Sequence, residues 1–309
     1  MANRPRVLSA LAVTTALGCG IIVGATAAAF AIARKVVTPV TRRLADTQVL
    51  SVDTRAQTIT LRRTADTVLP GRYGLFVNGE RDYLKIGALL TQTDTTATRK
   101  LLTEVAADEP IGRDATFSGW YYVHPSELHI PYREVDIPSP VGTCPAWLFP
   151  AKHGGDSTTW VINIHGRGTT RSETLRAAPA FREAGVTSLA ISYRNDTEAP
   201  RSDSGKYGLG ATEWRDVEAA IEFAVERGAR RIVLMGWSMG GAIALQTSLR
   251  SAHAEMIDSI ILDSPVVDWR TVLGYQARDP QLPGLIAENR APVDNRRVED
   301  DAVDHLGVG

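Results

Sequence analysis

The stretch that decides the fold is Arg231-Ile-Val-Leu-Met-Gly-Trp-Ser-Met-Gly-Gly-Ala-Ile-Ala-Leu245. Residues 232–235 are a short unbroken apolar run, which is typical of a strand buried on both faces. The run of small and apolar residues after Gly240 indicates a helix. A serine at such a strand-to-helix turn is held in a strained backbone conformation with its hydroxyl exposed at the edge of the sheet. We therefore predict that Ser238 is a nucleophile; the alternative is a glycine-rich turn that only packs a helix on a sheet.

Alternating strand and helix patterns surround this stretch. The pattern predicts strands at residues 133–137, 144–149, 160–164, 187–192 and 257–262, and helices at residues 172–184 and 212–227. The first two strands are expected to form a hairpin, and the last is expected to be buried. Such alternation predicts an α/β fold with a mostly parallel sheet covered by helices on both faces.

Four motifs resemble those of a known family. His165-Gly-Arg-Gly168, Tyr193-Arg194, Tyr207-Gly208 and the glycine-flanked serine of residues 236–241 follow one another with the order and spacing of the α/β-hydrolase fold. The similarity covers residues 132–271 and is to the prolyl-oligopeptidase-like and esterase-like branches. It implies a serine hydrolase that attacks an ester, thioester or amide carbonyl and passes through an acyl-enzyme. The motifs do not identify the substrate.

The same resemblance implies roles for residues around Ser238. In the family, the N–H after the nucleophile and one from the His-Gly loop bind the oxyanion. Here these are Met239 and Arg167, the second uncertain by one position. His165 is then expected to hold the loop rather than act as the base, and a free surface histidine is the alternative.

The end of the chain departs from the family's pattern. In the family, the acid of the triad usually follows the seventh strand and the histidine follows the eighth. The residues after Leu262 contain no convincing further buried strand, so we expect a sheet that lacks its last strands. This leaves two explanations: a fragment of a longer hydrolase, or a short, catalytically inactive protein that uses the pocket to bind or to act as a scaffold. A cofactor-free haloperoxidase or an acyltransferase on the same turn is a third alternative.

Few residues could complete a triad. Of the histidines, only His253 and His305 follow Ser238. His253 comes after the helix that begins at the serine, and a rise of about 1.5 Å per residue over roughly a dozen residues places it far from the hydroxyl. His305 is a candidate base only if the tail folds back. Asp263 is the candidate acid because it ends the strand predicted beside the nucleophile strand, and Asp268 is a second candidate.

The N-terminal segment is predicted to be a membrane anchor. Residues 7–33 carry no charge and are followed by Arg34 and Lys35, and about 20 apolar residues suffice to cross a bilayer. A cleaved signal peptide, which implies secretion, and lipidation at Cys19 are alternatives. The basic residues leave the side of the membrane open. We assign residues 1–35 to the anchor.

Residues 36–130 are predicted to form a small β-containing appendage of unknown role. Strands are expected at residues 58–62, 73–77 and 83–86, with a turn at Asn78-Gly79 between the last two. A short helix is expected at residues 98–107. The remaining residues, 131–309, are assigned to an incomplete α/β-hydrolase domain.

Composition limits the partners. The chain has 44% hydrophobic and 22% charged residues, and its net charge of −1 gives no reason to expect nucleic acid as a partner. Its two cysteines, Cys19 and Cys144, form no CxxC motif, and no Cys/His cluster for a metal is present. We therefore expect no cofactor and no metal, and the expected partners are an acyl substrate and a membrane.

Overall fold

The computed structural model describes residues 30–31, 33–40, 43, 45–107 and 109–276. Val36–Val267 form one compact unit, which contains a β-barrel and an α/β domain. Residues 1–35 and 268–309 form the other unit, and its described part includes α5 (Trp269–Gln276).

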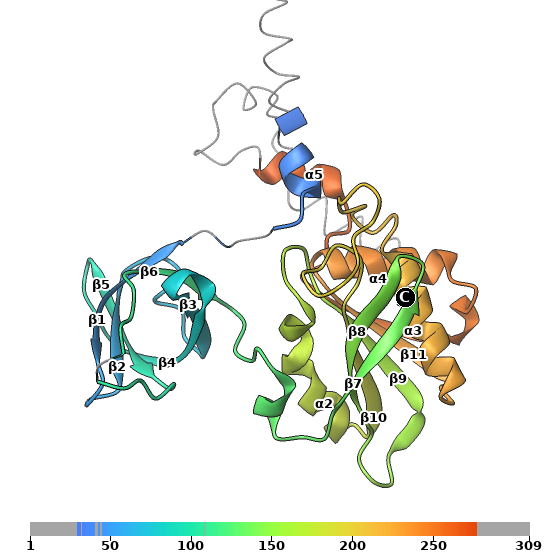
Figure 1. Cartoon of the computed structure of the whole chain (residues 1–309), viewed down its shortest axis with the longest axis horizontal. Helices are drawn as coiled ribbons and strands as arrows, with labels where there is room; N and C mark the ends of the chain where they lie inside the picture. The colour runs from blue at the N-terminus through green and yellow to red at the C-terminus, as the bar shows by residue number, and fades with distance from the viewer. Residues whose placement is uncertain (1–29, 32, 41–42, 44, 108, 277–309) are drawn as a thin grey trace, which may run out of the picture. The chain divides into compact units, whose positions relative to one another are not determined.

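The first part of the larger unit is a closed β-barrel (Figure 1). Its strands follow the order β1-β2-β5-β4-β3-β6, and β1 pairs with β6 to close the sheet. The strands are β1 (Thr47–Asp53), β2 (Thr58–Arg62), β3 (Tyr73–Val77), β4 (Asp82–Gln92), β5 (Thr96–Leu101) and β6 (Asp114–Ser118). The strands predicted at residues 58–62 and 73–77 are present, and β3 and β4 form the predicted hairpin around η1 (Asn78–Glu80).

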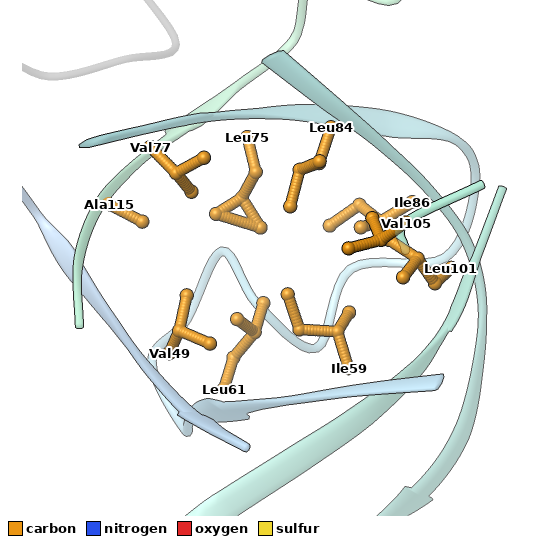
Figure 2. Packing of buried hydrophobic residues seen from close by; sticks show 10 residues of the cluster. All are labelled: Val49, Ile59, Leu61, Leu75, Val77, Leu84, Ile86, Leu101, Val105 and Ala115. Carbon is orange, nitrogen blue, oxygen red and sulfur yellow. The ribbon is translucent and has the colours of Figure 1, made fainter. Parts of the chain in front are cut away.

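The barrel interior is apolar (Figure 2). Alternate residues of each strand point inward, as strand geometry requires. Full burial of an aliphatic side chain stabilises the fold by about 1.5–3 kcal/mol, so this core can hold the small barrel together. The core residues are Val49, Ile59, Leu61, Leu75, Val77, Leu84, Ile86, Leu101, Val105 and Ala115.

Arg99 is fully buried in the barrel, in β5. Its Nε and Nη2 donate to the carbonyl oxygen of Gly87 at 2.9 and 2.7 Å, and Nη1 donates to those of Thr67 and Leu69 at 3.0 and 2.7 Å. Nη2 also donates to Gly71 O at 2.8 Å. One guanidinium therefore ties β4 and the loop before β3 to β5.

The predicted helix at residues 98–107 is wrong. Residues 98–101 belong to β5, where Ala97, Arg99 and Leu101 are buried and the residues between them are only partly so. Burial of every second residue is typical of a strand. The pattern is hard to recognise in the sequence because one inward position is an arginine, a residue that is usually exposed.

The α/β domain contains a six-stranded sheet in the order β12-β11-β9-β10-β8-β7 (Figure 1). The predicted hairpin is β7 with β8, and β10, β9, β11 and β12 run parallel to one another. Helix α2 lies on one face of the sheet, and α3 and α4 lie on the other. The predicted α/β architecture is thus confirmed. The bounds are β7 (Arg133–Ser139), β8 (Gly142–Phe149), β9 (Asp156–Ile164), η3 (Arg171–Ala177), α2 (Ala178–Glu183), β10 (Val186–Ile191), α3 (Trp214–Glu226), β11 (Arg231–Trp237), α4 (Met239–Arg250) and β12 (Ile257–Asp263).

Strand β12 lies at an edge of the sheet and is not buried as predicted. Ile261 and Leu262 are 40% and 37% exposed. Within the described residues β12 pairs only with β11, so its apolar run lacks the neighbour that would cover it. The last strands, predicted to be missing, would fall on residues outside the described range.

The predicted anchor, residues 7–33, lies almost wholly outside the described residues. Within the part of the chain that the structure does describe, no helix combines the length and the apolar character needed to cross a bilayer. The anchor therefore stays a prediction.

Replacing Arg99 by leucine is expected to destabilise the chain by about 2–5 kcal/mol, because four carbonyl oxygens, two of them in buried hydrogen bonds, lose the guanidinium as a donor. Urea denaturation of the full chain measures this loss. Arg62→Leu is the matched control, because Arg62 is exposed and bonds only to the side chain of Gln48. Equal stability of the two variants would show that the hydrogen bonds from Arg99 to these carbonyl groups do not hold the barrel.

Candidate active site

Ser238 lies at the junction of β11 and α4 in a conformation that L-residues rarely adopt. Its φ is 50° and its ψ is −114°. Such a residue costs about 1–3 kcal/mol and persists only where its surroundings fix it. Here the N–H of Ser238 donates to Asp263 O at 3.0 Å, and its carbonyl accepts from the N–H groups of Gly241 and Val266, both at 3.0 Å. The hydroxyl does not cap the helix, so it is not used for holding the turn.

Glycines allow the backbone to close around this serine. A Cβ at Gly236 would lie 2.4 Å from Gly240 O, and a Cβ at Gly240 would lie 2.1 Å from Ile164 O. A Cβ at Gly241 would meet the Cβ of Pro265 at 2.7 Å. These distances are too short for any side chain, so α4 packs against β9 and β11 backbone to backbone.

The His-Gly loop after β9 lies directly beside the serine. A Cβ at Gly166 would be 3.2 Å from the Cβ of Ser238 and 3.3 Å from Oε2 of Glu173. That same Oε2 accepts from Gly166 N–H at 2.8 Å and from Thr169 Oγ1 at 2.9 Å. Glu173 thus fixes the loop beside Ser238.

His165 is fully buried beneath this loop. Its Nε2 lies 2.8 Å from Asp196 Oδ2, and its Nδ1 lies 2.9 Å from Gly166 O. Its ring stacks on that of Tyr193 with a centroid distance of 4.2 Å, and the Tyr193 hydroxyl donates to the carbonyls of His165 and Gly166. Both ring nitrogens are engaged, so His165 supports the loop and has no nitrogen left to act as a base for Ser238.

The charge of His165 follows from these contacts. Burial alone lowers its pKa, but the charge and the hydrogen bond of Asp196 outweigh burial, and the pKa of His165 is raised above its usual value. Burial in turn raises the pKa of Asp196, and His165 opposes that effect. Because a carboxylate and a carbonyl oxygen face the two ring nitrogens, the contacts fit the doubly protonated ring and an ionised Asp196.

One predicted oxyanion donor, Met239, directly follows Ser238 in the chain, and the other, Arg167, lies in the His-Gly loop beside the serine. Met239 is the first residue of α4, where backbone N–H groups have no partner inside the helix. Arg167 follows Gly166, and its side chain donates to Val36 O at 2.5 Å and to Thr38 O at 3.2 Å. Their role in stabilising an oxyanion stays a prediction.

The predicted acid and base are not brought together in the described residues. Asp263 ends β12, and its half-exposed carboxylate accepts from Arg176 Nη2 at 3.3 Å and from Ser264 Oγ at 3.1 Å. It thus faces an arginine rather than a histidine. His305, the predicted base, lies outside the described range. Both assignments stay predictions.

One group among the described residues has side chains placed to hold a metal ion. Ligand atoms of Glu218, Glu222 and His253 all lie within 4.8 Å of one another. Glu218 and Glu222 lie in α3, and His253 lies beyond the end of α4, the helix that begins beside Ser238, as its position in the sequence predicted. The group is therefore separate from the serine.

Sequence analysis missed the buried charges that support the site. Besides Asp196 and Glu173, these include Asp216, which pairs with Arg194 through two bonds of 2.7 and 3.0 Å. Glu213 is fully buried and accepts from three backbone N–H groups of the loop before α3. A signal was available for Asp196, since a carboxylate in the loop after a buried strand is a candidate partner for a histidine after the neighbouring strand.

Two family models match the chain. One, described as the alpha/beta hydrolase family, matches residues 153–305. The other is a domain of unknown function (DUF8805) and matches residues 48–118, which are the barrel. No curated protein matches the sequence.

Several solved structures resemble the chain. The esterase Pf2001 from Pyrococcus furiosus is 22% identical, with a TM-score of 0.42, over 50% of this chain and 60% of that chain. XC6422 from Xanthomonas campestris, described as a serine hydrolase without a lid, is 23% identical, with a TM-score of 0.37, over 45% and 63%. A thermostable carboxyl esterase from Bacillus coagulans is 22% identical, with a TM-score of 0.35, over 43% and 44%. The chain spans less than two thirds of the length of each.

The match of residues 153–305 to the alpha/beta hydrolase family model agrees with the α/β sheet and with the strand-to-helix turn at Ser238. The resemblance predicted from the motifs is confirmed, and hydrolase function is supported at the level of the family.

Gly240→Ala is expected to destabilise the chain by about 1–3 kcal/mol or to prevent folding, because the new Cβ would meet Ile164 O. Helix propensity alone predicts the opposite sign, since alanine favours a helix over glycine. Thermal and urea denaturation measure the change. Gly119→Ala is the control, because nothing lies within 4 Å of a Cβ there; a stable, fully folded Gly240→Ala protein would contradict the close packing.

His165 is expected to make stability depend on pH. Its pKa is raised in the folded chain, so its contribution is complete below about pH 6.5 and is lost as the pH rises through the folded pKa. The difference in unfolding free energy between the wild type and His165→Gln should therefore shrink as the pH is raised from about 6 to about 9.

The control is His129→Asn, at an exposed histidine whose left-handed backbone asparagine tolerates. Its difference from the wild type should change little with pH. A His165→Gln difference that stays constant over the range would argue against the charged pair.

Proposed function

We propose that this chain is a membrane-anchored serine hydrolase that cleaves an ester, thioester or peptide bond through an acyl-enzyme on Ser238. One observation carries the proposal: Ser238 sits at φ 50° between β11 and α4, with the Gly166 loop against its Cβ. A strained serine between a buried strand and a helix, with close-packed glycines on either side, is typical of a nucleophile at the edge of an α/β sheet.

The reaction follows from the groups around the serine. Ser238 Oγ attacks the carbonyl carbon, its proton passes to a general base, and the carbonyl oxygen becomes an oxyanion. The N–H groups of Met239 and Arg167 are the proposed donors to that oxyanion. The oxyanion then collapses, the protonated base gives its proton to the departing alcohol, thiol or amine, and the acyl-enzyme remains. Water attacks the acyl-enzyme, gives a proton to the base, and the collapse of this second intermediate releases the acid and returns the proton to Ser238 Oγ. His305 as base and Asp263 as acid remain the candidates for the other two members of the triad.

The membrane part of the proposal rests on the sequence. Residues 7–33 are uncharged and long enough to cross a bilayer, and basic residues flank them. The hydrolase would then work close to the membrane surface, on whichever side the anchor places it.

A second candidate function is a hydrolase-fold protein that binds a ligand without cleaving it. Two observations favour it: Asp263 pairs with Arg176, and His165 has both nitrogens engaged by Gly166 and Asp196. His165, the histidine of the loop beside Ser238, is thus not available to take the proton of the serine.

A fluorophosphonate probe is expected to label the full chain at Ser238, because labelling needs an activated serine. Intact-mass and peptide mass spectrometry after labelling measure this. Ser238→Ala should reduce labelling to background. Ser264→Ala should leave it unchanged, since Ser264 also has a φ of 50° at the end of the neighbouring strand but lacks the helix behind it. A folded protein that stays unlabelled would favour the binding function.

A further inference from the structure

A cavity of about 470 Å³ lies within the larger unit. Glu173 and Arg176 of η3 line it, and each of them contacts a residue that in turn contacts Ser238. Glu173 Oε2 approaches the Gly166 position that contacts Ser238, and Arg176 bonds to Asp263, whose carbonyl accepts from Ser238 N–H. The cavity is therefore placed to receive a part of a molecule whose reacting group lies at Ser238.

The opposite wall of the cavity is aromatic. It comes from the end of β6 and the segment that follows, with Phe117, Trp120, Tyr121 and Tyr122. This wall is attached to the α/β domain close by, because Val123 O accepts from Ser172 Oγ at 2.7 Å and Tyr122 packs against the apolar cluster around Trp147. Aromatic rings of this kind bind an apolar or aromatic body at low entropic cost.

The charge on the cavity wall is positive. Three arginines line it, Arg43, Arg72 and Arg176, against the single carboxylate of Glu173. The Glu173 carboxylate is already held by Gly166 N–H and Thr169 Oγ1, so it offers little to a cationic ligand.

The three arginines differ in their partners. Arg43 pairs with Glu80 at 3.2 Å, and its guanidinium lies over the rings of Phe76 and Trp120. Arg176 pairs with Asp263 at 3.3 Å. Among the described residues, the guanidinium of Arg72 lies 5.9 Å from the centroid of the Tyr121 ring and pairs with no carboxylate. Its charge is therefore available to a ligand.

We propose that this cavity binds the non-reacting end of the substrate, and that this end carries a carboxylate on an apolar or aromatic body. Arg72 makes the ion pair with the carboxylate, the aromatic wall holds the body, and the scissile carbonyl lies at Ser238. The substrate class is thus an anionic ester, thioester or amide. The identity of the reacting group in this inference rests on the proposed function. The binding of the anion does not, because it depends only on the residues of the cavity.

Binding without reaction tests the anion site. The full chain with Ser238→Ala is titrated with 4-phenylbutyrate and with 4-phenylbutanamide, which differ in charge but hardly in shape, by isothermal titration calorimetry. We expect the carboxylate to bind about tenfold more tightly than the amide at low salt, and the preference to weaken as salt is added. Equal binding of the two compounds, or binding of neither, would overturn the inference.

Substitutions in the same background assign the preference to the cavity. Arg72→Gln should abolish the preference for the carboxylate, and Arg72→Lys, which keeps the charge, should restore most of it. Arg63→Gln is the matched control, because Arg63 is also exposed in the barrel but does not line the cavity. A preference that survives in Arg72→Gln would overturn the role of Arg72.

A covalent test separates this inference from the proposed function. The chain with its native serine is treated with two fluorophosphonates, one with a terminal carboxylate on its alkyl arm and one with the corresponding amide. Faster labelling by the carboxylate probe supports both proposals. Equal labelling rates keep the hydrolase and overturn the anionic substrate. No labelling, together with the carboxylate preference in calorimetry, keeps the anion site and overturns the hydrolase.

Discussion

Backbone packing around Ser238 is the constraint on which the rest of the α/β domain depends. Gly236, Gly240 and Gly241 bring helix α4 so close to the sheet that no Cβ fits at any of them. The helix can then begin immediately after the serine, and the serine must take a positive φ. Hydrogen bonds from Ser238 to Asp263 at the end of β12 and to Val266 beyond it offset this strain. The turn therefore depends on the observed pairing of β9, β11 and β12.

Buried charges hold the loops that surround this turn. His165 with Asp196 and Arg194 with Asp216 connect the segments after β9 and β10 and the start of α3. A buried ion pair stabilises little by itself, because desolvation opposes the attraction. Its value here is in geometry: Asp196 Oδ2 also accepts from Tyr193 N–H, and Asp216 Oδ2 also accepts from Arg194 N–H, so each carboxylate ties a side chain to the backbone of the loop after β10. The segments beside Ser238 are thereby held in place by side chains of the protein itself.

The sequence could predict most of the α/β domain because its signals are local. Apolar runs such as β9 and β11 mark strands that are buried on both faces, and the glycines around Ser238 mark the turn. The barrel was predicted only in part, since the alternation of β5 includes Arg99, and a buried arginine is recognisable only once its carbonyl partners are in place. Strand β12 was predicted to be buried because its composition is apolar, but exposure depends on neighbours that composition does not specify.

The candidate site was predictable to a similar degree. Ser238 and the glycines beside it could be read from residues adjacent in the chain. Glu173, Asp196 and the cavity wall at Trp120 could not, because each acts on the site through contacts between residues far apart in the sequence. The assignments of Asp263 and His305 depend on long-range contacts of the same kind and stay predictions.

The central claim is that Ser238 is a partly exposed nucleophile beside two oxyanion donors. The most direct test is a crystal structure of the full chain after reaction with an organophosphate. The account predicts a covalent bond from Ser238 Oγ to phosphorus, with one phosphoryl oxygen within hydrogen-bonding distance of the N–H groups of Met239 and Arg167. An unmodified serine in a relaxed helical conformation, or phosphorus on another residue, would contradict it.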